Sequence, residues 1–257
     1  MRNFLSAALA AGALVLPTLL APGVAHAQEG PPLPQLNWSF SGPFGTFDRA
    51  SAQRGFLVYK NVCSACHSMK YVHYRDLAGI GFTAAQIKAI AASVDVPMIK
   101  SDGTAGTRPG LPSDAFASPF PNDEAAKAAN DGVVPPDQSV LVDARAGGPN
   151  YIYAILTGYT KPPSGVRVPS GLYYNEYFPG HLIHMPPPLQ PDQVTYTDGT
   201  KATLDQEARD VTTFLYFVSN PEMEARKRMG VHIVIFLALL TGLTYAVKRK
   251  VWSDVEH

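Results

Sequence analysis

The most constraining feature of the 257-residue chain is its only pair of cysteines, Cys63 and Cys66, which lie in NVCSACHSM (61–69) and are followed at once by His67. A structural zinc site needs four ligands, usually from two such pairs, and no second cysteine pair exists. A thioredoxin-like redox pair opens a helix after a strand, whereas the residues before Cys63 have a helical pattern. Two sulfurs one helical turn apart can instead bond the two vinyl groups of a haem while the imidazole binds the iron. We therefore predict one covalently attached haem c, against the alternative of a chance motif with an inert disulfide.

Covalent haem of this type is expected outside the cytoplasm, and the N-terminus carries a matching export signal. A single positive charge at Arg2 precedes an apolar run over residues 4–20, and an A-x-A pattern ends at Ala27. A mitochondrial presequence would be amphipathic and richer in arginine. We predict that residues 1–27 are a cleaved signal peptide and that the source is bacterial.

A second apolar stretch, Met229–Val247, contains 19 residues without a formal charge. As a helix it would extend for about 28 Å, close to the thickness of a bilayer core. A buried core helix is the alternative, but Tyr245 and Trp252 supply the aromatic side chains typical of a membrane interface. Three basic residues flank each end, so charge alone leaves the orientation open. The cleaved signal places residues 28–228 in the periplasm as one haem domain, 229–247 in the inner membrane and 248–257 in the cytoplasm.

The net charge of zero conceals an asymmetry along the chain. Residues 28–225 carry 14 Lys and Arg against 19 Asp and Glu, a net charge of −5, whereas residues 226–257 carry 6 basic and 2 acidic side chains. An acidic domain attracts basic soluble partners and repels nucleic acid, although composition alone is equally compatible with a role in solubility. We expect a basic protein partner and membrane lipid, and no nucleic acid.

Composition and periodicity predict a mainly α haem domain with long ordered loops and one C-terminal transmembrane helix. The 23 prolines and 21 glycines cluster in the middle of the chain and favour loops there, including 101–120 and most of 147–191. Thr203 and Gln206 form a capping-box pattern before an apolar 3–4 repeat. Helical signals occupy residues 48–62, 83–93, 121–131, 151–156 and 203–218.

The second axial ligand of the iron decides whether the haem carries electrons or binds a substrate, and a methionine sulfur favours electron transfer. Met185 precedes three prolines in GHLIHMPPPLQ, which would hold a ligand loop stiffly, while Met98 in VDVPMIKS follows a single proline. The residues favour Met185 and leave Met98 open. His181 and His184 offer a bis-histidine alternative.

Several separated motifs resemble the cytochrome c1 family, the haem subunits of ubiquinol–cytochrome c oxidoreductases (cytochrome bc1 complexes). Besides RGFLVYKNVCSACHSM and PEMEARKRMG, they are FPNDEAAKAANDGVVPPDQS, ARAGGPNYIYAILTGY, GLYYNEYFPGHLIHMPPPL and YTDGTKATLDQEARDVTTFLYF. Their order is far more specific than CxxCH alone, and they cover most of residues 40–253.

The resemblance implies a cytochrome c-like haem domain and a complete set of haem contacts. It implies covalent attachment at Cys63 and Cys66, with His67 and Met185 as axial ligands, and so favours Met185 over Met98. It further implies that Arg145 pairs with a haem propionate and that three other residues line the pocket. These three are Asn130, Pro136 and Tyr151. Some bacterial relatives carry an additional disulfide that holds the ligand loop, and this chain has no third cysteine.

The function implied is electron transfer without a catalytic site of its own. The chain would take one electron from the Rieske iron–sulfur protein, pass it to a soluble or tethered cytochrome c, and pack its helix beside cytochrome b. Two alternatives are a haem enzyme with an open iron site, such as a peroxidase, and a membrane-tethered monohaem subunit of another respiratory complex, such as a nitric oxide reductase or terminal oxidase.

Overall fold

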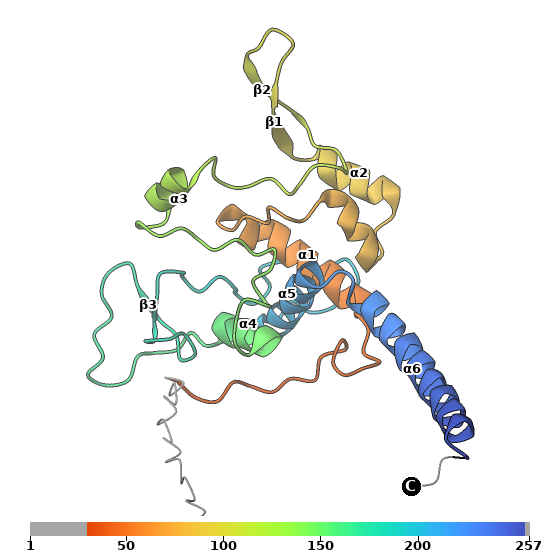
Figure 1. Ribbon diagram of the computed structural model, residues 1–257. Coiled ribbons are helices and arrows are strands. Elements are labelled where there is room, and N and C mark those ends of the chain that lie inside the picture. The colour runs from red at the N-terminus through yellow and green to blue at the C-terminus, as the bar shows by residue number, and fades with distance from the viewer. Residues whose placement is uncertain (1–29, 255–257) are drawn as a thin grey trace, which may run out of the picture.

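The computed structural model describes residues 30–254, so the predicted signal peptide lies outside the described residues. Figure 1 shows a helical body with two hairpins and one long helix that leaves it. The helices are α1 (Arg49–Asn61), α2 (Ala84–Ala92), α3 (Asp123–Ala129), α4 (Gly148–Thr157), α5 (Leu204–Ser219) and α6 (Met223–Val251), with 3-10 turns η1 (Cys63–Ala65) and η2 (Tyr74–Ile80). The strands are β1 (Asp95–Ile99), β2 (Ala105–Pro109), β3 (Tyr173–Tyr174) and β4 (Leu182–Ile183). The prediction of a mainly α fold with a C-terminal apolar helix is confirmed.

The centre of the body is the crossing of α1 and α5. Asp48 caps α1 by accepting a hydrogen bond from the backbone N–H of Ser51 at 3.1 Å. The two helices approach so closely that a Cβ at Gly55 would overlap the backbone carbonyl of Asp210. Phe56 and Phe214 pack edge to face across this crossing, with ring centroids 5.6 Å apart. α4 packs on α5, and this three-helix arrangement supports the site described below.

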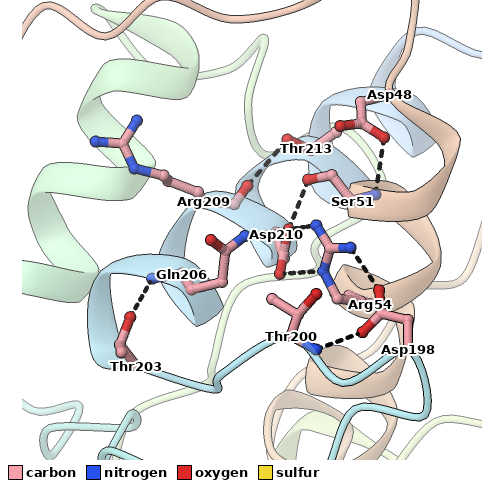
Figure 2. Close-up of polar contacts among 10 residues, drawn as sticks. All are labelled: Asp48, Ser51, Arg54, Asp198, Thr200, Thr203, Gln206, Arg209, Asp210 and Thr213. Carbon is pink, nitrogen blue, oxygen red and sulfur yellow. Dashed lines mark hydrogen bonds and ion pairs between the residues drawn. The ribbon is translucent and has the colours of Figure 1, made fainter.

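A buried polar cluster joins α1 to α5 (Figure 2). The carboxylate of Asp210 is fully buried and accepts hydrogen bonds from Ser51 Oγ at 2.7 Å and from Arg54 Nε at 2.8 Å and Nη2 at 3.0 Å. The same guanidinium donates from Nη1 to Asp198 at 2.8 Å. Because both Asp210 oxygens are satisfied, the charge can be buried between the helices without an unpaired partner.

The predicted capping box of α5 forms only in part. Thr203 accepts a hydrogen bond from the backbone N–H of Gln206 at 3.2 Å, as predicted. The side chain of Gln206, however, donates to Asp210 at 3.0 Å instead of returning to the cap. The buried carboxylate of Asp210, one helical turn away, therefore binds the Gln206 side chain that the sequence pattern predicted at the N-terminus of the helix.

The prediction that residues 101–120 are entirely loop is wrong. Ala105–Pro109 pairs antiparallel with Asp95–Ile99 in a two-stranded hairpin that projects beyond α2 in Figure 1. Gly103, with φ of 82°, and the backbone bond from Lys100 N–H to the Thr104 carbonyl at 2.8 Å close its turn. Proline is tolerated in a ladder with only two strands, since each strand has a free edge.

α6 leaves the body and carries the predicted transmembrane stretch. Among the described residues it is the helix long and apolar enough to cross a bilayer, and of its side chains only Met223 is buried. Its first turns are attached to the N-terminal segment. Glu224 accepts from the backbone N–H of Phe47 at 2.8 Å and forms two hydrogen bonds with Arg49, at 3.1 and 2.9 Å.

Candidate functional site

A cavity of about 630 Å³ lies between η1, α4, α5 and the two long loops on either side of α4. This volume lies within the range typical of cofactor pockets. All eight residues predicted as haem contacts line it, although they come from distant parts of the chain. They are Cys63, Cys66, His67, Asn130, Pro136, Arg145, Tyr151 and Met185.

The cysteine motif forms a tight turn at the end of α1. The backbone N–H groups of Cys66 and His67 both donate to the carbonyl of Cys63, at 3.1 and 2.9 Å. This turn directs all three side chains to the cavity wall. Cys63 is buried, which raises the pKa of its thiol to about 12, while Cys66 is exposed. Neither cysteine forms a disulfide, so both sulfurs can react.

His67 is oriented by a backbone carbonyl. Its ring Nδ1 lies 2.8 Å from the carbonyl oxygen of Pro136. A carbonyl can only accept, so Nδ1 carries the proton and Nε2 keeps a free lone pair. Burial lowers the pKa of His67, although the bond to Pro136 and the charge of Asp137 oppose this shift. The imidazole is therefore neutral and oriented, as a metal ligand needs to be.

Asp137 fixes the loop that supplies this carbonyl. Its carboxylate accepts hydrogen bonds from Ser68 Oγ at 2.7 Å, from the backbone N–H of Lys70 at 2.9 Å and from the N–H of Ser139 at 2.9 Å. The segment that follows His67 is thus joined to the segment that follows Pro136 through one side chain. The histidine and its partner are held as one unit.

The loop that carries Met185 is held at both ends. Tyr159 donates from its hydroxyl to the backbone carbonyl of Met185 at 3.0 Å. Farther along, Leu189 is buried in the core. Before the methionine, the β3–β4 pair ties Tyr173 to Ile183.

Asn175 connects this loop to α4. It is fully buried; its Nδ2 donates to the carbonyl of Ile155 at 2.8 Å, and its Oδ1 accepts from the N–H of Tyr177 at 3.0 Å. Its backbone N–H also donates to the carbonyl of His181 at 2.9 Å. Hydrogen bonds therefore supply the attachment that a disulfide would otherwise provide.

The competing axial ligands are placed differently from Met185. Met98 lies in β1, on the projecting hairpin, and does not line the cavity. His181 does not line it either, and its ring stacks on Tyr174 with centroids 5.6 Å apart. His184 lines the cavity but is exposed. The sequence left two methionines as candidates. Met185 lies at the same cavity as the cysteine motif, and Met98 does not.

The remaining predicted residues form the rim and one wall. Arg145 is exposed at the cavity, where its Nη1 donates to the carbonyl of Ala144 at 3.2 Å. Burial raises the pKa of Tyr151, against the opposing effect of the nearby Arg145. Asn130 ends α3 and donates to the carbonyl of Ala126 at 2.8 Å. Arg145 thus brings a positive charge to the cavity, whose lining also includes the acidic Asp131.

Sequence reasoning missed the apolar walls and the loop supports. α4 and α5 contribute branched side chains, and the polar supports Tyr159 and Asn175 had no local signal. The wall residues are Val133, Val134, Leu141, Ile152, Ile155, Leu156, Val211 and Leu215. An apolar chamber with two free thiols, a neutral imidazole, a thioether and a cation at the rim has the chemistry needed to hold a haem.

Comparisons with known proteins agree with this geometry. A sequence profile described as the Cytochrome C1 family matches residues 38–255. "Cytochrome c1" from Rhodospirillum rubrum is 44% identical over 275 residues, covering 100% of both chains. "Cytochrome b/c1" from Bradyrhizobium diazoefficiens is 46% identical over 96% of this chain, which spans only 39% of that longer protein. "Cytochrome b-c1 complex catalytic subunit, mitochondrial" from Candida albicans is 43% identical over 93% of this chain and 84% of its own length.

Proposed function

The chain belongs to the cytochrome c1 family, whose members carry covalently attached haem c, and from this premise we propose that it is the electron-transferring haem subunit of a cytochrome bc1 complex. The observation that supports this most directly is the convergence of Cys63, Cys66, His67 and Met185 on one cavity. When bound, the haem supplies one-electron redox chemistry at its iron.

The residues have distinct roles in holding the haem. Cys63 and Cys66 would hold the haem through thioether bonds, each formed by adding a thiol S–H across a vinyl group, which needs no external oxidant. His67 would offer Nε2 to the iron, because Nδ1 is occupied by the Pro136 carbonyl. Met185 would offer its thioether sulfur as a second ligand. Its backbone is held by Tyr159, which would limit movement of this ligand between redox states.

Arg145 compensates the charge of a haem propionate at the rim of the cavity. A carboxylate that is partly removed from water needs such a partner. Asn130, Pro136 and Tyr151 complete the wall around it. Electron transfer needs no nucleophile or general base, and we propose that the chain contributes electron transfer without a catalytic site of its own.

The partners follow from charge and from relatives. The name of the Candida relative places that protein in a cytochrome b-c1 complex, and the Bradyrhizobium name joins cytochromes b and c1 in one protein. We extend this assembly to the present chain, with α6 beside cytochrome b, the Rieske iron–sulfur protein as electron donor and a soluble or tethered cytochrome c as acceptor. The net charge of −5 over residues 28–225 suits a basic acceptor.

The topology is a single pass through the membrane. Residues 28–228 form the periplasmic haem domain, 229–247 the span and 248–257 the cytoplasmic tail, following cleavage of residues 1–27. Copurification of the full chain from membranes tests the assembly. Cytochrome b and a Rieske protein should accompany it, whereas copper or non-haem iron subunits would favour another respiratory complex.

Substitution of Met185 by leucine tests the ligand assignment. Met185→Leu should keep the covalent haem and lower the midpoint potential by on the order of 0.1 V or more, within the ~0.8 V over which axial ligands tune haems. Met98→Leu is the matched control, since Met98 lies outside the cavity. A potentiometric titration measures both variants. A potential for Met185→Leu equal to that of the control would reject Met185 as ligand.

A further inference from the structure

The tight turn formed by residues 41–46 presents one large apolar side chain to the outside. Phe44 is 80% exposed, the most of any large hydrophobic residue in the described chain. We propose that this turn is a second membrane contact, in which Phe44 enters the interfacial layer of the bilayer that α6 crosses. The inference rests on the single-pass topology of the proposed function.

The turn lies beside the start of the apolar stretch. Lys227 of α6 donates from Nζ to the backbone carbonyls of Phe40 at 2.7 Å and Gly45 at 3.0 Å, so it holds both ends of the turn. Lys227 precedes the first apolar residue, Met229, by two positions, which corresponds to about 3 Å along a helix. The polar layer on each side of a bilayer core is roughly 5–7 Å thick. The turn is therefore held at the height of the lipid headgroups.

The frame behind Phe44 is rigid. Backbone bonds close the turn, from Gly45 N–H to the Gly42 carbonyl at 3.4 Å and from Thr46 N–H to the Ser39 carbonyl at 3.0 Å. A Cβ at Gly45 would overlap the backbone of Phe40, so only glycine fits there. Phe40 in turn stacks on Tyr216 of α5, with ring centroids 4.0 Å apart. A fixed turn loses little conformational entropy when it inserts its apolar side chain.

The chemistry around the turn fits lipid. From Met229 onward α6 presents an exposed apolar surface, so lipid that surrounds the helix continues up to the turn. Arg226 and Arg228 are exposed in the first turns of α6 and complement anionic headgroups. Acidic side chains also lie nearby: Glu222 and Asp48 are exposed, and Asp143 is joined to Arg226 through Asn220. Glu224 is paired with Arg49.

Depth measurement with a single nitroxide label tests the contact. In the mature haem protein the thioethers occupy both native cysteines, so Phe44→Cys introduces one free thiol. The labelled full chain is placed in vesicles of phosphatidylcholine and phosphatidylglycerol. Collision of the label with oxygen, which partitions into lipid, is compared with collision with a water-soluble nickel chelate, each against the same sample under nitrogen. Tyr71→Cys is the control in the haem domain, because Tyr71 is 73% exposed and distant in sequence from α6.

The proposal expects an oxygen-to-nickel ratio several-fold higher at position 44 than at position 71. A ratio at 44 equal to that at 71 would place the turn in water, and weak collision with both reagents would place it against a protein subunit; either result overturns the proposal. Leu240→Cys, in the middle of α6, reports separately on the span. A water-exposed label there rejects the single-pass topology, whereas a lipid-exposed label at 240 with a water-exposed one at 44 rejects only this inference. Labelling of the unsubstituted chain tests the haem thioethers independently.

Discussion

The buried ion pair between α1 and α5 makes Asp210→Asn a demanding test of the fold. The substitution keeps the size of the side chain but places an amide N–H₂ where the carboxylate accepts bonds from Arg54 and Ser51. In either orientation, the amide N–H₂ group of asparagine faces at least one of these donors, and two donors cannot form a hydrogen bond with each other. The partly buried guanidinium also loses the fully buried one of its two counter-charges.

The expected loss of stability is about 3 kcal/mol. Removing one partner of a buried ion pair costs roughly 3–5 kcal/mol. The lower end applies here, because the Arg54 side chain is 15% exposed and keeps its second bond, to Asp198. Against a total stability of roughly 5–15 kcal/mol, such a loss is large.

Urea unfolding of the full haem protein in detergent, followed by circular dichroism, measures this loss. Asp198→Asn is the matched control, because it removes the exposed carboxylate bound to the same arginine. Its unfolding midpoint should fall far less than that of Asp210→Asn. If the two variants lower the midpoint equally, burial does not determine the strength of this pair and the reasoning is refuted.

Two further predictions concern the ligand loop and acid stability. Asn175→Ala leaves the Ile155 carbonyl and the Tyr177 N–H without their partners and should cost about 2 kcal/mol. The sulfur-to-iron charge-transfer band should then disappear at a lower urea concentration than the helical signal; simultaneous loss of both would contradict a role in holding Met185. The hydrogen bond from Arg108 lowers the pKa of Asp114 to about 2, below its unfolded value of about 3.9. This pair therefore stabilises the fold above about pH 4, and its contribution is lost as the pH falls towards 2. The urea midpoint of Asp114→Asn should therefore decline less between about pH 5 and about pH 3 than that of the unsubstituted chain. An equally steep decline in both proteins would argue against a stabilising role of this pair.

Local patterns in the sequence predicted those features that depend on neighbouring residues. The helix expected over residues 48–62 depends on contacts within a few positions, and the structure has α1 there, ending at the tight turn of Cys63 and Cys66. The sequence around Met185, rich in proline, indicated a stiff loop. Without the fold, however, it could not exclude Met98, which the hairpin removes from the cavity.

The missed features depend on contacts between distant segments. Asn175 stabilises the loop through a carbonyl of α4 that is 20 residues away, and the sequence near it gives no sign of that partner. Gln206 has the right spacing for a capping box, but a buried carboxylate competes for its side chain. In both cases tertiary packing decides between options that are equivalent locally.

The attachment of α6 to the body has a consequence for the proposed electron transfer. Glu224 and Lys227 bind the first turns of the helix to the N-terminal segment through five hydrogen bonds of 2.7–3.1 Å. Three of them join backbone groups of Phe47, Phe40 and Gly45, and the other two join Arg49. These contacts restrict tilting of the body relative to α6. In the proposed haem protein, the iron would then stay at a constant height above the membrane. Each electron-transfer partner would have to move to the haem, because the haem could not move to the partner.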